Sequence, residues 1–224
     1  MNDINSYFYR YMADNYLENK YDEYRGRDAR KVVVKRIGQP LENLLRKNRS
    51  FRGYAQQPEV TREMLENIVK VNTLLPSARN QQVLRFRLVT SGGEADAVLQ
   101  NIALGGALPE LHLPFAGTEP HAFIVVCSCV TENRMVDIDL GISAQSMLLK
   151  AVEMGLNGII ICAFNRENIR KALSLPYDPL AIIAIGKGAE TICCVPISAD
   201  ESHAYYRRDG VHYVPKVRWE ELLV

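Results

Sequence analysis

The sequence lacks a long apolar run and any large excess of charge of one sign. A helix that spans a bilayer needs about 18 or more consecutive apolar residues, and no such run is present. The charged, Tyr-rich beginning also lacks the apolar stretch of a secretory signal. The 27 Lys and Arg residues nearly balance the 26 Asp and Glu residues, so the charge gives no reason to expect nucleic acid as a partner. We expect a cytoplasmic protein that binds neither nucleic acid nor membranes.

Patterns of metal ligands and of catalytic nucleophiles are missing as well. The four histidines are scattered, with no His-Glu-x-x-His helix and no nucleophile turn beside them. The cysteines are odd in number and lie among apolar and β-branched residues, which favours reduced thiols in the core; they are Cys127, Cys129, Cys162, Cys193 and Cys194. We therefore assign no metal and do not expect a hydrolase.

What is present is an ordinary globular composition of 224 residues, 47% hydrophobic and 24% charged. Apolar and aromatic residues recur at helical offsets over 3–24, and a basic connector follows over 25–40. We predict an N-terminal helix and connecting arm in residues 1–40, followed by a single domain over residues 41–224.

Apolar periodicity and turn residues predict the elements of that domain. Thr61 and Asn165 are the expected caps at the start of two of its helices. The helices are expected over 41–47, 61–75, 94–104, 137–154 and 166–173, and the strands over 83–90, 122–130, 158–164 and 180–185, with a hairpin around Asp209-Gly210. Strands interleaved with helices predict an α+β or α/β domain with one mixed sheet packed by helices.

The first candidate for binding is Arg49-Ser50-Phe51-Arg52. Its two guanidiniums can turn toward one anion while the serine hydroxyl and backbone amides add donors, as phosphate recognition requires. The segment therefore indicates a phosphate clamp. The alternative is that both arginines form surface ion pairs with Glu42 or Glu59.

The second candidate is the segment from Pro76 to Gln82. A residue before proline disfavours the α region, so a helix ends here and residues 77–82 form a loop. The planar side-chain amides of Asn80, Gln81 and Gln82 can meet the edge of a heterocycle, although such residues also occur simply as turn formers. A phosphate clamp followed by an amide loop suits a flavin mononucleotide.

In order and spacing, these two segments resemble the Arg-Ser-x-Arg and Pro-Ser-x-x-Asn-x-Gln motifs of the FMN-dependent nitroreductase family. Three later segments strengthen the resemblance: 139–149 is similar to the family's central dimer helix, 155–158 to its Gly-Leu-Gly turn and 182–190 to its last core strand. The resemblance implies an α+β nitroreductase-like fold, with a central mixed β-sheet flanked by helices, in an intertwined homodimer. The small residues Gly141, Ser143 and Ala144 allow another helix to approach closely, from the same chain or a second subunit.

The resemblance also implies which residues bind FMN at the subunit interface. Arg49, Ser50 and Arg52 would hold the phosphate and ribityl end, Pro76, Ser77, Asn80 and Gln82 would come from the second subunit, and Gln145, Leu156, Asn157 and Gly158 would approach the ring. Late basic residues, Lys216 and Arg218, would close the phosphate site, with Arg207 and Arg208 as rivals. No catalytic side chain is predicted, because the flavin N5 carries the chemistry.

The function implied by the resemblance is transfer of two electrons from NAD(P)H, through FMN, to a nitroaromatic, quinone or similar electron-poor small molecule. The sequence has no Gly-x-Gly-x-x-Gly motif that opens a strand-turn-helix unit, which argues against a separate nicotinamide domain. We therefore expect the donor and the acceptor to use the flavin in turn, by a ping-pong mechanism. The alternatives are a flavin-dependent dehydrogenase or reductive dehalogenase-like enzyme of the same fold, and a non-catalytic flavin-binding redox module.

Overall fold

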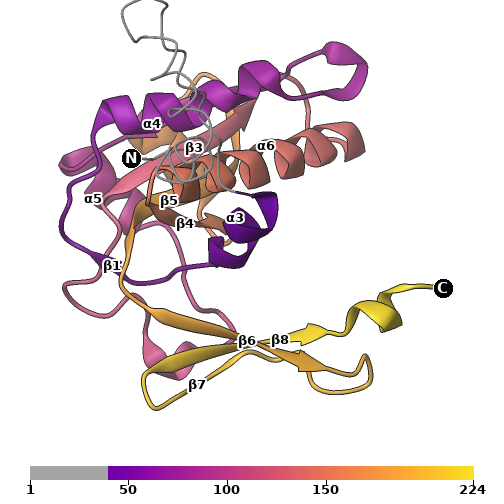
Figure 1. Cartoon of the computed structure of the whole chain (residues 1–224). Coiled ribbons are helices and arrows are strands. Elements are labelled where there is room, and N and C mark those ends of the chain that lie inside the picture. The colour runs from indigo at the N-terminus through magenta and orange to yellow at the C-terminus, as the bar shows by residue number, and fades with distance from the viewer. Residues whose placement is uncertain (1–39) are drawn as a thin grey trace, which may run out of the picture. The chain divides into compact units, whose positions relative to one another are not determined.

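The structure is a computed structural model that describes residues 40–224 (Figure 1). The chain divides into two compact units, Met1–Lys47 and Asn48–Val224. In the first unit the structure describes helix α3, Leu41–Lys47, as predicted, with an exposed ion pair between Arg46 and Glu42. The predicted N-terminal helix and connecting arm over 1–40 lie outside the described residues, apart from Pro40.

The second unit is built on a five-stranded sheet in the order β1-β5-β3-β2, with β4 also paired to β5. The strands are β1 (Tyr54–Ala55), β2 (Leu84–Val89), β3 (Ala122–Ser128), β4 (Asn157–Ile161) and β5 (Asp178–Gly188). All of these strand pairings are antiparallel, so the expected mixed sheet is wrong for this sheet within the described residues. Strands β3 and β4 run in the same direction, but they do not pair with each other. Strand β5 lies between them and pairs antiparallel with both, so no parallel pair forms.

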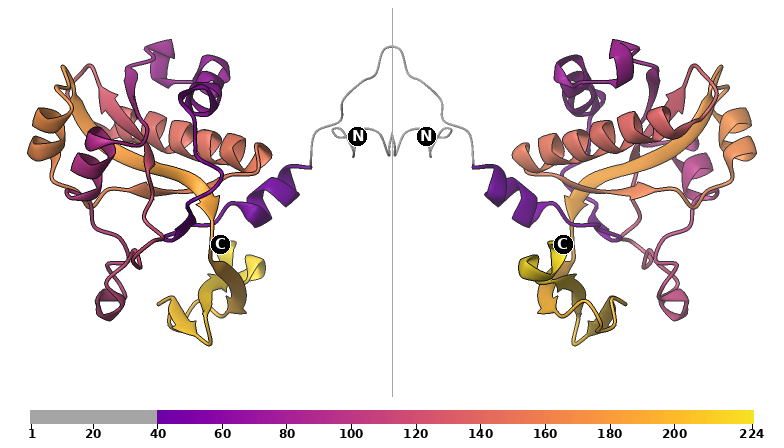
Figure 2. Two further views of the ribbon diagram at one scale, coloured as in Figure 1. Left: turned by 90° about the vertical axis from the view of Figure 1, so that its left-hand side faces the viewer. Right: turned by 90° about the vertical axis from the view of Figure 1, so that its right-hand side faces the viewer.

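Helices cover both faces of this sheet, as expected. Helices α4 (Arg62–Val69) and α6 (Arg134–Glu153) pack on one face, and α5 (Gly93–Leu99) and α7 (Arg166–Ala172) on the other. Successive residues of a strand point to opposite faces, so Ile124 of β3 packs with α6 while Phe123 packs with α5 and α7. Figure 2 shows α6 lying along the sheet.

Side-chain caps fix where these helices begin. The predicted cap Thr61 accepts a hydrogen bond from the Met64 N–H at 3.3 Å, and Asn165 accepts one from the Asn168 N–H at 2.9 Å. Helix α6 begins three residues before the predicted Asp137, because the Asn133 side chain accepts from the backbone at the helix start. Short 3-10 helices complete the unit: η2 (Lys70–Leu74), η3 (Ala78–Asn80), η4 (Pro109–Leu111) and η5 (Trp219–Leu222).

A second, three-stranded sheet lies to one side of the first (Figures 1 and 2). Its strands β6 (Thr191–Ile197), β8 (Val211–Val217) and β7 (Tyr206–Arg208) pair in this order, with β6 and β8 parallel and β7 and β8 antiparallel. Asp209 and Gly210 join β7 to β8 with φ angles of 52° and 78°, the left-handed conformation of a tight two-residue hairpin turn. This hairpin confirms the prediction for the Asp-Gly turn.

The cysteines are less buried than predicted. All five are free thiols, but Cys162, Cys193 and Cys194 are exposed, whereas Cys127 is buried and Cys129 is partly buried. The expectation of core thiols is therefore wrong for three of them, because β6 is mostly exposed to solvent and Cys162 lies beyond the end of β4. Residues 40–224 hold no group of three or more His, Cys, Asp or Glu side chains placed to bind a metal ion. Within the same residues no helix is long and apolar enough to cross a bilayer.

Candidate functional site

The Arg49–Arg52 segment lies beside the start of β4. The Phe51 N–H donates a hydrogen bond to the Gly158 carbonyl at 3.2 Å, and Ser50 forms a single parallel bridge with the same glycine. A Cβ on Gly158 would lie 2.5 Å from the Ala184 carbonyl oxygen and 2.6 Å from a methyl group of Leu148, so only glycine fits here. The predicted clamp and the predicted Leu156–Gly158 turn are therefore neighbours in one chain.

Arg52 is a buried cation, with only 8% of its surface exposed. Its Nη1 donates to the Ser50 carbonyl at 3.0 Å and lies 3.4 Å from Nε2 of His212, while its guanidinium stacks 4.7 Å from the Tyr205 ring centre. No carboxylate forms an ion pair with the Arg52 guanidinium among residues 40–224. The alternative of a surface ion pair with Glu59 is wrong for Arg52, because Arg52 is buried and forms no ion pair among the described residues, while the Glu59 carboxylate accepts from Ser91.

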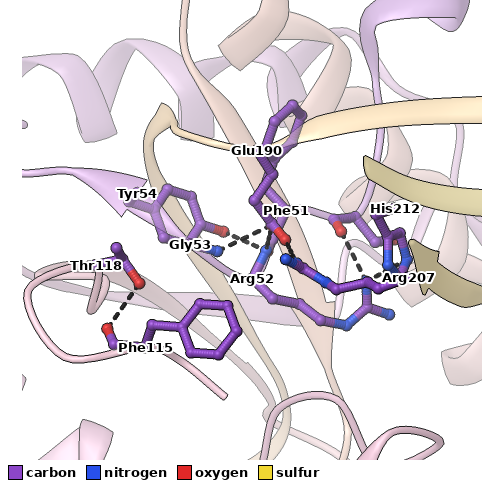
Figure 3. A network of polar contacts seen from close by, with 10 residues as sticks. Phe51, Arg52, Gly53, Tyr54, Phe115, Thr118, Glu190, Arg207 and His212 are labelled. Carbon is purple, nitrogen blue, oxygen red and sulfur yellow. Dashed lines mark hydrogen bonds and ion pairs between the residues drawn. The ribbon is translucent and has the colours of Figure 1, made fainter. Parts of the chain in front are cut away.

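Glu190 fixes the backbone of the clamp. Its carboxylate accepts hydrogen bonds from the backbone N–H of Arg52 and, at 2.9 Å, from that of Gly53 (Figure 3). The same carboxylate forms an ion pair with Arg207 of β7, and the two side chains are 7% and 17% exposed. Glu190 thus balances the partly buried Arg207 guanidinium and leaves Arg52 without a counter-charge.

Figure 3 shows Arg52, Arg207 and His212 gathered with Glu190 in one group, which we name the basic cluster. Burial, reinforced by the two nearby guanidiniums, lowers the pKa of His212 to about 4. Burial and the charge of Arg52 also lower the pKa of Arg207. Nε of Arg52, Nε of Arg207 and Nδ1 of His212 are buried and lack a hydrogen-bond partner among the described residues. A buried excess of positive charge with unmatched donors is the environment that an anion requires.

The amide loop is anchored to α6. The buried Asp139 carboxylate accepts from the Ala78 N–H with its two oxygens at 2.9 and 3.2 Å. Arg79, Asn80 and Gln82 all adopt positive φ, between 49° and 56°. Gln82 Nε2 donates to Asn80 Oδ1 at 3.1 Å, so these two predicted amides bond to each other.

A cavity of about 310 Å³ lies beside this loop. Pro76, Ser77 and Gln82 line it together with Asp139 and Ser143 of α6 and residues of β2. In the described part of the chain, no hydrogen bond or ion pair joins the Pro76–Gln82 loop to the Arg49–Arg52 segment. The structure thus presents the two predicted motifs as separate features of one subunit.

The other predicted site residues fall into two groups. Close to the clamp, Gln145 Oε1 accepts from Asn48 at 3.3 Å, Asn157 Oδ1 accepts from the Gly188 N–H at 3.0 Å, and Leu156 is buried. The exposed Lys216 side chain makes no hydrogen bond or ion pair within residues 40–224, and the Arg218 side chain instead bonds to Ser198 at 2.5 Å and to Glu221 at 3.5 Å. The late basic residue that the structure brings to Arg52 is Arg207, one of the two rivals.

Glu190, Tyr205 and His212 were missed by sequence reasoning. The sequence does indicate that Arg207 and His212 are neighbours, because a hairpin with a two-residue turn at 209–210 pairs them directly across its strands. Nothing in the sequence joins this hairpin or Glu190 to the Arg49–Arg52 segment, since that contact depends on tertiary packing.

The chain is similar to known proteins in both sequence and fold. A family model described as the nitroreductase family matches residues 45–187. An FMN-dependent nitroreductase from Clostridium difficile is similar in structure, with 27% identity and a TM-score of 0.56 over 67% of this chain and 88% of that chain. An FMN- and NADPH-dependent nitroreductase from a Sphingopyxis strain gives 20% identity and a TM-score of 0.57 over 67% and 89% of the two chains. A nitroreductase-like protein from Exiguobacterium sibiricum, solved in complex with FMN, has 18% sequence identity and a TM-score of 0.57, over 68% of this chain and 90% of that chain.

A comparison with curated protein sequences gave no match. The family model, however, covers more than half of the chain, and the similar folds cover about two thirds of it. On this evidence the protein belongs to the nitroreductase family, a family of oxidoreductases.

Proposed function

We propose that this protein is an FMN-dependent oxidoreductase that transfers two electrons from NAD(P)H to a nitroaromatic, quinone or similar electron-poor acceptor in the cytoplasm. The observation that carries the proposal is the buried Arg52 guanidinium, which lies beside Ser50 and has no carboxylate partner among residues 40–224. An uncompensated buried charge is costly, so a site that keeps one is suited to an anionic ligand.

The residues present fit this cofactor. Arg49, Ser50 and Arg52 would hold its phosphate and ribityl end, and Gln145 with the Leu156–Gly158 turn, which lie close to the clamp, would approach its ring. Bound FMN would supply the two-electron chemistry. The chain's own residues would neutralise the phosphate, orient the ring and exclude water. The names of the similar proteins from Clostridium difficile and Sphingopyxis support this choice of cofactor.

The amide loop would come from a second copy of the chain. Helix α6 packs its Met147 side against the sheet, yet Met135 and Ile138 on its other side are 47% and 45% exposed. Gly141 is also exposed, and apart from its own helix and chain neighbours no atom of residues 40–224 lies within 4 Å of where its Cβ would be, so another helix could approach closely. A helix that is apolar on both sides needs a second partner, and we propose a homodimer built on α6. The partner's Pro76, Ser77, Asn80 and Gln82 would then complete the flavin site.

The kinetic proposal is a ping-pong mechanism in which NAD(P)H leaves before the acceptor binds. It is supported by the sequence, which contains no dinucleotide-binding glycine motif that would hold NAD(P)H apart from the flavin. Initial rates at several fixed acceptor concentrations test it, and parallel double-reciprocal lines are expected. Intersecting lines would indicate a ternary complex and contradict this part of the proposal.

Arg52→Ala tests the site itself. Removing one charge-assisted contact with the phosphate costs roughly 1.5 to 3 kcal/mol, so FMN affinity should fall about ten- to hundredfold. Fluorescence titration of FMN measures the change, and Arg62→Ala is a matched control, because Arg62 is an exposed arginine paired with Glu66 on α4. Equal affinities for the two variants would remove Arg52 from the site. Bleaching of the bound flavin by NADH or NADPH then separates an enzyme from a flavin-binding module without turnover.

A further inference from the structure

The β7–β8 hairpin turns one face toward the clamp. Arg207 and His212 are direct cross-strand partners, so their side chains lie on the same face of the hairpin. Tyr205 is two residues before Arg207 and shares this face, with its ring 5.0 Å from the His212 ring and 4.7 Å from the Arg52 guanidinium. The hairpin therefore gathers a cation, an imidazole and an aromatic ring around Arg52.

The contact between Arg52 and His212 fixes the tautomer of the imidazole. A guanidinium has only donors, so Nε2 of His212, 3.4 Å from Arg52 Nη1, is the acceptor. The proton of the neutral ring then lies on Nδ1. That Nδ1 is buried and has no hydrogen-bond partner within residues 40–224. Since His212 is only 1% exposed, bulk solvent does not reach its Nδ1–H.

The charged groups around this histidine leave a positive excess. Arg52 and Arg207 each carry one positive charge, and the Glu190 carboxylate is paired with Arg207. The Nε–H groups of Arg52 and Arg207 also lack acceptors in the described part of the chain. Three unmatched N–H donors and one uncompensated positive charge therefore occur in a single cluster. A tetrahedral phosphate offers several acceptor oxygens and the negative charge that this cluster lacks.

We propose that the flavin phosphate binds to the basic cluster through the Nδ1–H of His212 and the Nε–H groups of Arg52 and Arg207. This inference rests on the proposed function, because it identifies the anion as the phosphate of FMN. It makes His212 a ligand of the phosphate. It also makes Arg207, rather than Lys216 or Arg218, the basic residue from the C-terminal part of the chain that closes the phosphate site. The half-buried Tyr205 ring packs on Arg52 and against His212.

Paired titrations with FMN and riboflavin isolate the phosphate contribution, because the two flavins differ only in that group. The measured quantity is the ratio of the riboflavin Kd to the FMN Kd. In His212→Gln the side-chain amide takes the place of Nε2 and can accept from Arg52, but the N–H at the δ position is lost. We expect the ratio to fall about tenfold or more in His212→Gln and in Arg207→Gln, with little change in riboflavin affinity.

Arg208→Gln is the matched control for the hairpin. Arg208 is the next residue along β7, its side chain is 68% exposed, and it stacks over Tyr213 on the opposite face. Its ratio of dissociation constants should equal that of the unaltered protein. Lys216→Gln and Arg218→Gln complete the set, and a fall in the ratio confined to these two variants would overturn the proposal in favour of the C-terminal cations.

Nitrogen-15 NMR of the histidine side chains provides a readout that does not depend on a variant folding. In the unaltered protein, the Nδ1–H resonance of His212 should shift when FMN is added and stay in place when riboflavin is added. A resonance that responds equally to both flavins would overturn the proposal, as would a folded His212→Gln variant with an unchanged ratio. If the unaltered protein binds neither flavin, the proposed function fails; if it binds FMN with no role for His212, only this inference fails.

Discussion

Replacing Glu190 with glutamine tests the charge balance of the basic cluster. One Glu190 oxygen accepts from the backbone N–H groups of Arg52 and Gly53, and the other pairs with Arg207. In Glu190→Gln the amide oxygen can keep the two backbone contacts, but the NH2 group then faces the Arg207 guanidinium, donor against donor. The variant also leaves the buried Arg52 and the partly buried Arg207 without any carboxylate partner among residues 40–224.

The expected cost follows from the burial of the pair. The Arg207 and Glu190 side chains are 17% and 7% exposed, so solvent screens their interaction weakly. Removing one partner of a buried ion pair costs about 3 kcal/mol or more, because the other charge stays buried. For a chain of this size, that loss lowers Tm by about 6 to 12 °C. Glu132→Gln, in an exposed pair with Arg166, is the matched control and should cost at most about 1 kcal/mol.

Urea denaturation followed by circular dichroism measures both variants, and inorganic phosphate gives the experiment a second arm. Because Glu190→Gln doubles the uncompensated charge, phosphate should restore its stability more than it stabilises the unaltered protein. The double variant Glu190→Gln with Arg207→Gln should be more stable than Glu190→Gln alone, since it removes the orphaned cation. The reasoning is refuted if Glu190→Gln is no less stable than Glu132→Gln, or if phosphate affects all variants equally.

Three further predictions concern other parts of the account. Asp139→Asn replaces charge-assisted contacts with neutral ones at the Ala78 N–H, so we expect a loss of about 1 kcal/mol and faster amide hydrogen exchange at Ala78; unchanged exchange would contradict the anchoring role. The pKa of His212 is about 4 in the folded protein against an ordinary 6.5, so the unfolded chain binds the proton first. Stability should therefore fall by about 3 kcal/mol as pH drops from 6.5 toward 4, and an equally steep fall in His212→Asn would assign the loss to other groups. Ile138→Asp places a charge on the exposed apolar side of α6 and should convert the proposed dimer to monomers in sedimentation velocity, whereas an unchanged dimer would exclude this face.

The sequence predicts the elements of this fold well because their signals are local. Thr61 and Asn165 are found as helix caps, and Asp209-Gly210 forms the predicted hairpin turn, because caps and turns depend on a few neighbouring residues. The prediction of a mixed central sheet failed because strand pairing is not a local property. Whether β5 inserts between β3 and β4 depends on how distant strands pair, which no local pattern contains.

The candidate site shows the same division. The motif from Arg49 to Arg52 can be read directly, and the family resemblance assigns both it and Gly158 to one flavin site, whereas the bridge between Ser50 and Gly158 is visible only in the structure. Glu190 and His212 could not be predicted, because each acts through a contact with Arg52 from more than 100 residues away along the chain. Which of Arg207 and Arg218 lies beside Arg52 likewise depends on which face of the small sheet turns toward the core.

The most direct test of the central claim is FMN binding by the purified protein. After incubation with excess FMN and gel filtration, the account predicts a yellow protein with about one FMN per chain. The flavin absorbance should be retained by Arg62→Ala and largely lost by Arg52→Ala. A colourless protein that takes up no FMN, or equal retention by both variants, would contradict the claim that a buried arginine clamp holds the flavin phosphate.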